Sequence, residues 1–471
     1  MNVKQSTPHV GSGTESGNTK TPEEIPQEEI RAHGADRKYR NLRKATIYTL
    51  LQFLIIIGVG GSSIAPADLR QGGMATIVAA WDFNLVAWEV DALWQKLRAF
   101  VMQPSHDLDY TTSVSLIRDY LARAQSMQEL ERSINQLLSE DGASDGADTG
   151  APVTPVQERI ASYQAELVAL RQEQELHRST VEQIIERQIS TELVTAGLSH
   201  FGQAFPPVQF TFVEPPRKLV VSPRDRITTE YSQMLEATMS LPEIEAAEEA
   251  YFTLYNSSAY ITNIGGLGAF PTMVVDRASL EWILSTVAHE WTHNYLTLFP
   301  LGFNYLTDAD FITMNETVAE IVGNELGEQA LRTFYPALAP PPVNVVGDSD
   351  ELRESERMPL DDEFHFDFRK EMHETRLVVD QLLAQGKVED AEDYMEARRI
   401  YFVENGYQLR VLNQGYFAFH GSYGTSAASS SPIGPQLEAL RAQSPDLKTF
   451  LEQVRWFTSP TDITEALHHS N

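Results

Sequence analysis

The stretch Ser285-Thr-Val-Ala-His-Glu-Trp-Thr-His-Asn-Tyr-Leu296 decides how the rest of this 471-residue chain is interpreted. On a helix, His289 and His293 would project from one face, about one turn apart. Two neutral imidazoles at that separation can hold one Zn²⁺, and Glu290 beside them can reach a metal-bound water as general base. The stretch therefore predicts a metal site built on a helix.

The residues around this stretch also favour a helix. We expect Asp276 to act as its N-cap and Pro300 to end it. Apolar residues recur between these two positions at helical spacing and would form a buried face, and they are Leu280, Ile283, Leu284 and Val287.

A second stretch, Met314-Asn-Glu-Thr-Val-Ala-Glu-Ile-Val-Gly-Asn-Glu-Leu-Gly327, predicts another helix, with Glu316 and Glu320 four residues apart. A zinc hydrolase needs three protein ligands and an open fourth position, and Glu316 can be the third ligand. Glu320, one turn further on, can orient one of the histidines. A solvated acidic face is the alternative, and it fits poorly because mostly apolar residues surround the two glutamates.

The two motifs together resemble those of the gluzincin metallopeptidases, the thermolysin-like and aminopeptidase-like zinc enzymes. That family has His-Glu-x-x-His followed by Asn-Glu-x-x-x-Glu/Asp, and here the second motif is Asn315 to Glu320. The resemblance covers about residues 265–326 and looks closest to uncharacterised membrane-anchored bacterial peptidases. It implies zinc as the cofactor, His289, His293 and Glu316 as ligands, Glu290 as base, and Asn315 and Glu320 as residues that support the ligands.

The resemblance also implies a zincin-like core, in which a small sheet precedes the zinc helix and its last strand is an edge that can pair with an extended substrate. Aminopeptidases of the related family carry a Gly-x-Met-Glu-Asn loop that binds the free amine of the substrate. The corresponding loop here, Gly265-Gly-Leu-Gly-Ala-Phe270, has no such glutamate. Endopeptidase and exopeptidase action therefore both remain open.

A cluster of hydrogen-bond donors near the C-terminus supplies candidates for stabilising the charge that develops on the carbonyl oxygen during peptide hydrolysis. The cluster runs from Asn413 to Tyr423. Tyr423 and His420 are the candidate donors. An aromatic core run is the competing interpretation for most of these residues.

Composition narrows the classes of partner. The formal net charge is −30, so nucleic acid is excluded as an expected partner because it would be repelled. The same charge favours neutral or cationic peptides as substrates. There is no cysteine, so neither a disulfide framework nor a thiolate site is expected.

The N-terminal part of the chain predicts a membrane anchor. Residues 1–44 are polar and end in a basic cluster, and residues 45–67 carry no charge and are long enough to span a bilayer. The position of the basic cluster predicts a cytoplasmic N-terminus. A cleaved signal peptide is the alternative, because Ala65-Pro-Ala67 has a small-x-small pattern, but its n-region would be too long. We therefore expect a single-pass cell-membrane protein with its catalytic domain outside the cytoplasm.

The middle of the chain predicts helices followed by short strands. Residues 74–101 are apolar but interrupted by acidic residues, so we expect a helix rather than a second span. Residues 113–139 and 155–198 have helical periodicity and predict an antiparallel hairpin. An intramolecular coiled-coil arm is the simpler interpretation, and a stalk or homo-oligomerisation element is the alternative. Short β-branched runs predict strands at 208–213, 218–222, 258–263 and 271–275, with a helix at 242–255 and a flexible loop at 265–270.

The expected fold class is α+β and mostly helical, in six parts. These are a disordered cytoplasmic tail (1–44), a transmembrane signal anchor (45–67), a helical region with a long hairpin (68–200), a zincin-like catalytic core (201–335), a Pro-rich and acidic connector (336–367) and a C-terminal helical subdomain (368–471).

The expected function is zinc-dependent hydrolysis of a peptide or protein substrate. Zinc would lower the pKa of its bound water, and Glu290 would take the proton and return it to the leaving amine. The alternative is a non-catalytic envelope interaction protein whose helical arm binds a partner and whose zinc site is structural or inactive.

Overall fold

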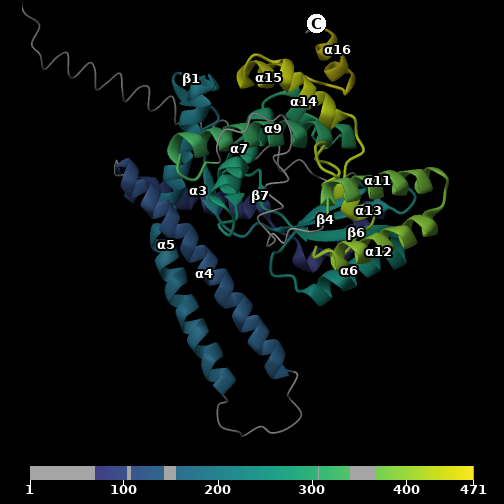
Figure 1. The fold of residues 1–471 in the computed structure, drawn as a ribbon, viewed down its shortest axis with the longest axis horizontal. Coiled ribbons are helices and arrows are strands. Elements are labelled where there is room, and N and C mark those ends of the chain that lie inside the picture. Colours follow the sequence, from purple (N-terminus) through teal and green to yellow (C-terminus); the bar gives the residue numbers. More distant parts are fainter. Residues whose placement is uncertain (1–68, 103–107, 143–154, 306, 340–365, 470–471) are drawn as a thin grey trace, which may run out of the picture. The chain divides into compact units, whose positions relative to one another are not determined.

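The computed structural model describes residues 69–102, 108–142, 155–305, 307–339 and 366–469. All of them belong to one compact unit, Ile56–Asn471, and the other unit, Met1–Ile55, lies outside the described residues. The described chain is α+β and mostly helical with small sheets, which confirms the predicted fold class at that level (Figure 1). The sequence-based domain boundaries remain predictions.

The described strands fall in the middle of the chain, between residues 199 and 274, with helices before and after them. In chain order, the elements are α2 (Leu69–Ile77), η1 (Ala79–Trp81), α3 (Leu85–Met102), α4 (Tyr110–Gly142), α5 (Pro155–Thr195), β1 (Ser199–His200), β2 (Gln203–Ala204), β3 (Phe210–Phe212), β4 (Arg217–Pro223), β5 (Tyr231–Leu235), α6 (Leu241–Tyr255), β6 (Ser257–Asn263), β7 (Gly266–Leu267), β8 (Thr272–Val274), α7 (Leu280–Leu296), α8 (Pro300–Phe303), α9 (Ala309–Phe334), α11 (Phe368–Ala384), α12 (Val388–Glu404), α13 (Gln414–His420), α14 (Ile433–Gln443), α15 (Leu447–Val454) and α16 (Thr461–His469).

Three sheets are present in the described residues: β1–β2, β3–β8–β7 and β5–β4–β6. In the last of these, β4 is the central strand and pairs antiparallel with β5 and β6. Leu219 and Val221 of β4 pack on α2 and α6 in one apolar core. Helix α13 also packs on this sheet and contacts both β4 and β6. The sheet is therefore covered on its apolar face by α2 and α6, and it is also covered by α13 from the C-terminal region.

The sheet β3–β8–β7 differs from the expectation in two ways. The segment 265–270 was predicted to be a flexible loop, but Gly266–Leu267 form strand β7, antiparallel to β8, and Ala269 and Phe270 are buried. Because β7 pairs with one side of β8 and β3 pairs with the other, β8 is the central strand rather than the edge. Within the described residues, the unpaired edge of this sheet that lies next to α7 belongs to β7.

The residue that caps α7 also differs from the expectation. Ser279, not Asp276, is the N-cap, and its Oγ accepts a hydrogen bond from Trp282 N at 3.2 Å. Asp276 instead accepts hydrogen bonds from Tyr120 of α4 and Gln174 of α5, so its carboxylate ties the hairpin to the loop before α7. The helix ends at Leu296, and Pro300 begins α8.

The predicted helical hairpin is present as α4 and α5, which pack along each other in an antiparallel pair (Figure 1). The apolar contacts include Ala124, Ile134 and Leu167, and the end of α5 continues into the main core through Ile185 and Ile189. The hairpin is therefore anchored in the same core as α7 and α9. The predicted helix at 74–101 is broken into α2, η1 and α3.

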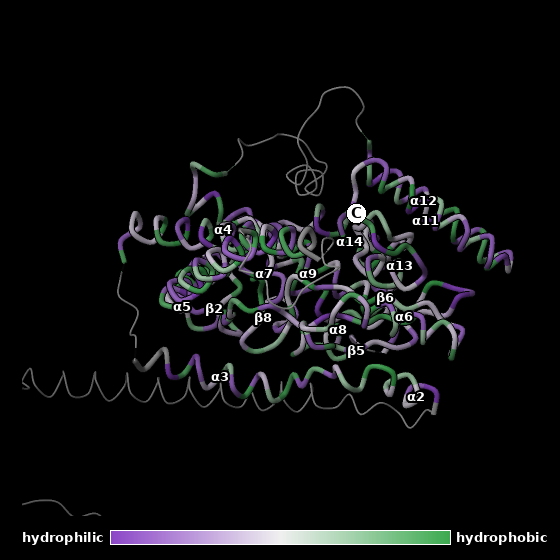
Figure 2. The backbone as a smooth tube through the Cα atoms, turned by 90° about the horizontal axis from the view of Figure 1, so that it is seen from below, coloured by the Kyte–Doolittle hydropathy of each residue, from purple (hydrophilic) through white to green (hydrophobic). Residues whose placement is uncertain are grey.

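A single transmembrane helix was expected from the sequence, and this expectation is corrected. Among the described residues, no helix is long and apolar enough to cross a bilayer. The longest helices, α4 and α5, mix hydrophilic and hydrophobic residues along their length (Figure 2). Residues 45–67, on which the expectation depended, lie outside the described residues, as does most of the connector 336–367.

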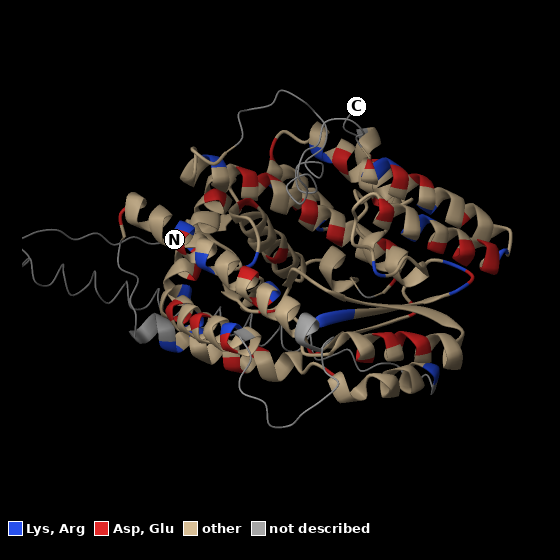
Figure 3. Cartoon of the chain, turned by 60° about the horizontal axis from the view of Figure 1, so that its bottom comes forward, with Lys and Arg blue, Asp and Glu red and all other residues tan. Residues whose placement is uncertain are grey.

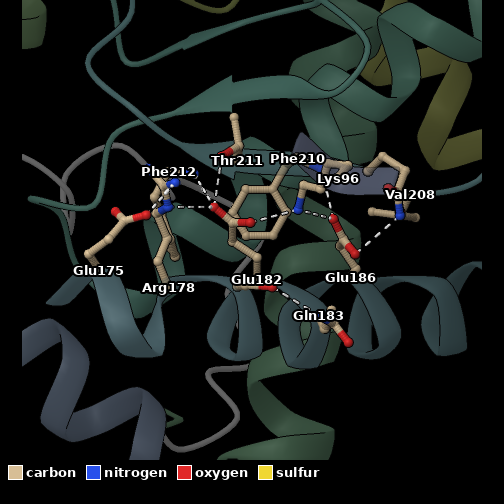
Figure 4. Close-up of polar contacts among 12 residues, drawn as sticks. Lys96, Glu175, Arg178, Glu182, Gln183, Glu186, Val208, Phe210, Thr211 and Phe212 are labelled. Carbon is tan, nitrogen blue, oxygen red and sulfur yellow. Dashed lines mark hydrogen bonds and ion pairs between the residues drawn. The ribbon is translucent and has the colours of Figure 1, made fainter. Parts of the chain in front are cut away.

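Lys96 of α3 connects α5 to strand β3 through two buried carboxylates (Figure 4). Its Nζ lies 2.7 Å from Glu182 Oε2 and 2.9 Å from Glu186 Oε1. The same two carboxylates accept the backbone N–H groups of Phe212 at 2.8 Å and Phe210 at 3.0 Å. These N–H groups lie on the side of β3 away from β8, so the glutamates satisfy an edge that no described strand pairs with.

Replacing Lys96 by Met should destabilise the protein by about 3 kcal/mol, because two buried carboxylates would lose their shared cation. Urea unfolding followed by circular dichroism measures this change. Arg118→Met is the matched control, since Arg118 is exposed and contacts only Asp119 within the described residues, and it should change the free energy of unfolding by less than about 0.5 kcal/mol. Equal stability of the Lys96 variant and wild type would contradict the prediction.

Candidate metal centre

The packing of α7 against α9 brings the two sequence motifs together. The helices lie side by side in the centre of the described chain (Figure 1). Gly323 and Gly327 of α9 face α7, and a Cβ at Gly323 would lie 2.8 Å from His289 Cβ, while one at Gly327 would lie 2.3 Å from Ser285 Oγ. Only glycine permits such an approach, so these two positions set the distance between the helices.

Three side chains converge where the helices meet. His289 Nε2 and His293 Nε2 are 3.0 Å apart, and each lies 3.6 Å from Glu316 Oε2. Ligand bonds of about 2.1 Å in tetrahedral geometry place donor atoms about 3.4 Å apart. The three atoms are therefore spaced as ligands of one tetrahedral ion would be, and the described residues offer no other cluster of this kind.

The electrostatics at this cluster favour positive charge. Burial alone would lower the pKa of His293, but the carboxylates of Glu316 and Glu290 and the Asn315 side chain raise it to about 9. Burial alone would raise the pKa of Glu316, but the two imidazoles hold it well below its usual range. A cation bound between these groups would take the place of the proton on the imidazoles.

Asn315 fixes the orientation of His293. The His293 Nδ1 and Asn315 Oδ1 atoms are 2.7 Å apart, and the Asn315 amide in turn donates to the carbonyl of Leu301 at 3.3 Å. With Nδ1–H donating to the amide oxygen, the other ring nitrogen, Nε2, faces Glu316 Oε2 at 3.6 Å. This is the arrangement that a metal-ligating histidine requires.

The structure gives Glu320 a hydrogen bond from the Thr425 hydroxyl. Its charge also acts on Tyr423, whose pKa it helps to raise. The predicted role of Glu320, orienting one of the histidines, stays a prediction.

Glu290 is buried beside the histidines, under the backbone of the β7 segment. A Cβ at Gly266 would lie 2.4 Å from Glu290 Oε1, and one at Gly268 would lie 3.3 Å from Glu290 Oε2. Burial raises the pKa of Glu290, although the two histidines oppose this effect. A carboxyl group with a raised pKa next to a cation-favouring cluster can both accept and return a proton.

Two tyrosines complete the surroundings of Glu316. Tyr423, one of the two predicted donors, has its ring 6.3 Å from that of His289, and the nearby Glu316 charge, with burial, raises the pKa of its hydroxyl. Tyr305 was missed by sequence analysis, and its hydroxyl donates to Glu316 Oε1. A tyrosine only 11 residues before Glu316, in the turn between the two motifs, was the signal that could have pointed to it.

His420, the other predicted donor, lies among aromatic rings. Its ring centroid is 4.2 Å from that of Tyr416 and 4.9 Å from that of Phe419, and its Nε2 is 3.4 Å from Tyr260 Oη. No hydrogen bond, ion pair or ring contact links it to His289, His293 or Glu316 within the described chain. Burial lowers its pKa to about 4. The contacts of His420 are those of a core residue.

Comparisons with known proteins assign this chain to no family. No protein-family model matches the chain, no curated protein matches it, and no solved structure matches it.

His420 should make the fold sensitive to mild acid. Its folded-state pKa of about 4 lies below the ordinary value near 6.5, so the stability that depends on neutral His420 is complete above about pH 6.5 and is lost as the pH falls toward 4. On going from pH 7 to pH 5, the free energy of unfolding should therefore fall by about 2 kcal/mol less in His420→Phe than in wild type.

Urea unfolding at the two pH values measures this difference. His373→Gln, at an exposed position of α11, is the control and should follow wild type. The assignment fails if His420→Phe loses as much stability as wild type between the two pH values.

Proposed function

We propose that this protein is a zinc-dependent peptide hydrolase with a zincin-like catalytic core, using His289, His293 and Glu316 as metal ligands. The observation that carries the proposal is the convergence of three donor atoms at 3.0 and 3.6 Å with a buried carboxylate, Glu290, on the same helix. Two imidazoles and a carboxylate form a donor set used by catalytic zinc sites. The field at the cluster, which raises the pKa of His293, supports a cation there.

The number of donors favours a catalytic site over a structural one. Structural zinc sites use four protein ligands, whereas catalytic sites use three and keep one position open. Among the described residues, the cluster contains three. This count argues against the alternative of a non-catalytic interaction protein with a structural zinc site.

Each residue of the site has a role in peptide hydrolysis. Zinc held there would act as a Lewis acid that polarises the scissile carbonyl and acidifies water. Glu290 takes a proton from the attacking water and delivers it to the leaving amine, a task suited to a carboxyl group whose pKa burial has raised. Tyr423 donates a hydrogen bond to the oxygen on which negative charge develops. Asn315 holds His293 in the tautomer that ligation needs.

The free edge of β7 supports an extended peptide as the substrate. Among the strands that the structure describes, Gly266 and Leu267 pair with β8 alone. Gly266 and Gly268 lie against Glu290, so a peptide that paired with the open edge of β7 would pass beside the general base. Backbone pairing requires no particular side chain, so this contact alone would accept many sequences.

Glu290→Gln should bind zinc as wild type does and lose peptide cleavage by a factor of at least about 10³, because the variant cannot move the proton. Zinc content by mass spectrometry and digestion of a peptide library by the full-length chain measure the two properties. Glu281→Gln, on the first turn of α7, is the control and should keep both. A Glu290→Gln variant that cleaves normally, or a wild-type chain without zinc, rules out the proposed function.

Asn315→Ala should weaken zinc binding roughly tenfold to a hundredfold, since the His293 ring would lose the hydrogen bond that orients it. Competition against a chromophoric chelator measures the affinity without any assumption about the substrate. Asn324→Ala, further along α9, is the control and should bind zinc with wild-type affinity. Equal zinc affinities of Asn315→Ala and wild type would show that the amide does not support the ligand.

A further inference from the structure

Lys218 lies on the face of the β5–β4–β6 sheet opposite the apolar core. Its neighbours Leu219 and Val221 are fully buried in the core formed with α2 and α6. Alternation along a strand puts Lys218 on the same side as Val220. In the register of the sheet, Lys218 is opposite Met234 of β5 and Thr262 of β6, so these three share one face.

Two sets of neighbouring residues connect this face of the sheet with the candidate metal cluster. Thr262 is near the end of β6, and the chain reaches Gly266, which lies against Glu290, only four residues later. Tyr260, next to Thr262 on the same face, has its ring 6.1 Å from Phe419, and Phe419 is 6.4 Å from Tyr423 at the cluster. Lys218 is therefore at the end of the sheet nearest to the general base.

The amine of Lys218 is partly buried but has no counter-charge in contact with it. Within the described residues it makes no hydrogen bond and no ion pair, whereas Lys96 contacts two glutamates and Arg410 contacts Glu248. Burial lowers the pKa of Lys218, and the charge of Glu316 opposes this effect. A buried or partly buried cation without a partner is unfavourable, so an anion beside it would be stabilising.

Metal binding would increase this need for an anion. A dication held by His289, His293 and Glu316 would neutralise the Glu316 charge that acts on Lys218. Lys218 would then lie near a positive centre without a compensating carboxylate. Lysine is a flexible point charge that binds carboxylates through its three N–H donors.

We propose that Lys218 binds a carboxylate of the peptide substrate, either the free C-terminal carboxylate or an Asp or Glu side chain. This inference depends on the proposed function, because it assigns a substrate class to the same site. It also departs from what net charge suggests. Acidic side chains recur along the helices of the described chain (Figure 3), and a charge of −30 does not attract anionic peptides from a distance, so recognition is local.

Peptide binding by the full-length, zinc-loaded chain tests the proposal, with Glu290→Gln as background so that no peptide is consumed. The probes are N-acetyl-Ala-Ala-Phe as the free acid and as the amide, and the amides of N-acetyl-Ala-Asp-Ala and N-acetyl-Ala-Asn-Ala, each titrated by calorimetry. The variants are Lys218→Met, Lys218→Arg and the exposed control Lys387→Met. Lys218→Gln is a second neutral variant if Lys218→Met fails to fold.

We expect one carboxylate peptide to bind roughly tenfold to a hundredfold more tightly than its neutral partner, in line with a hydrogen bond between charged groups. Lys218→Met should remove that difference, and Lys218→Arg and Lys387→Met should keep most of it. A difference confined to the acid and amide pair identifies the C-terminal carboxylate, and one confined to the Asp and Asn pair identifies a side chain.

Equal binding of all four peptides by the unsubstituted background overturns the inference, and so does a carboxylate preference that survives Lys218→Met. An equal loss for acid and amide in Lys218→Met also overturns it, because Lys218 would then act on every substrate alike. These outcomes are separate from failure of the proposed function, which zinc content and the cleavage activity of wild type and Glu290→Gln decide on their own.

Discussion

The close approach of α7 and α9 is the constraint on which the rest of the site depends. Two glycines on α9, Gly323 and Gly327, lie where any side chain would collide with Ser285 or His289 of α7. Their spacing of four residues matches the spacing of Ser285 and His289, so the two helix faces fit along a full turn. The short distance between the helix backbones lets a glutamate on one reach two histidines on the other.

A second consequence of this packing is a strong local field. Glu316 and Glu290 are both buried near the two imidazoles, in a region of low dielectric constant. Charges in such surroundings need partners, and the pKa values of His293 and Glu316 shift in opposite directions toward the charged forms. Such a field would favour a cation at the cluster under the proposed function. Tyr305 donates a hydrogen bond to Glu316, and Tyr423 lies beside the same carboxylate.

Helix α3 links the N-terminal helices to the site. Glu89 is buried and accepts a hydrogen bond from Phe270 N at 3.2 Å, at the end of the segment that contains β7. About two turns further along the helix, Lys96 connects the two glutamates of α5 to the edge of β3. Glu89, one of the acidic residues that interrupt the apolar run at 74–101, thus has a structural role, because it fixes the end of the segment that lies against Glu290.

The sequence by itself determined which side chains form the candidate metal cluster and where most of the described helices lie. His289 and His293 could be named because ligand spacing on one helix is a local property, and Glu316 was named from the second motif. The hairpin α4–α5 and the helix from 309 to 334 follow from local periodicity. Only the tertiary structure decided that β8 is central and β7 is the edge, that Ser279 and not Asp276 caps α7, and that Tyr305 joins Tyr423 at Glu316 while His420 packs among aromatic rings. These features depend on which distant segments meet, and contacts between residues far apart in the chain leave no periodic pattern in the sequence.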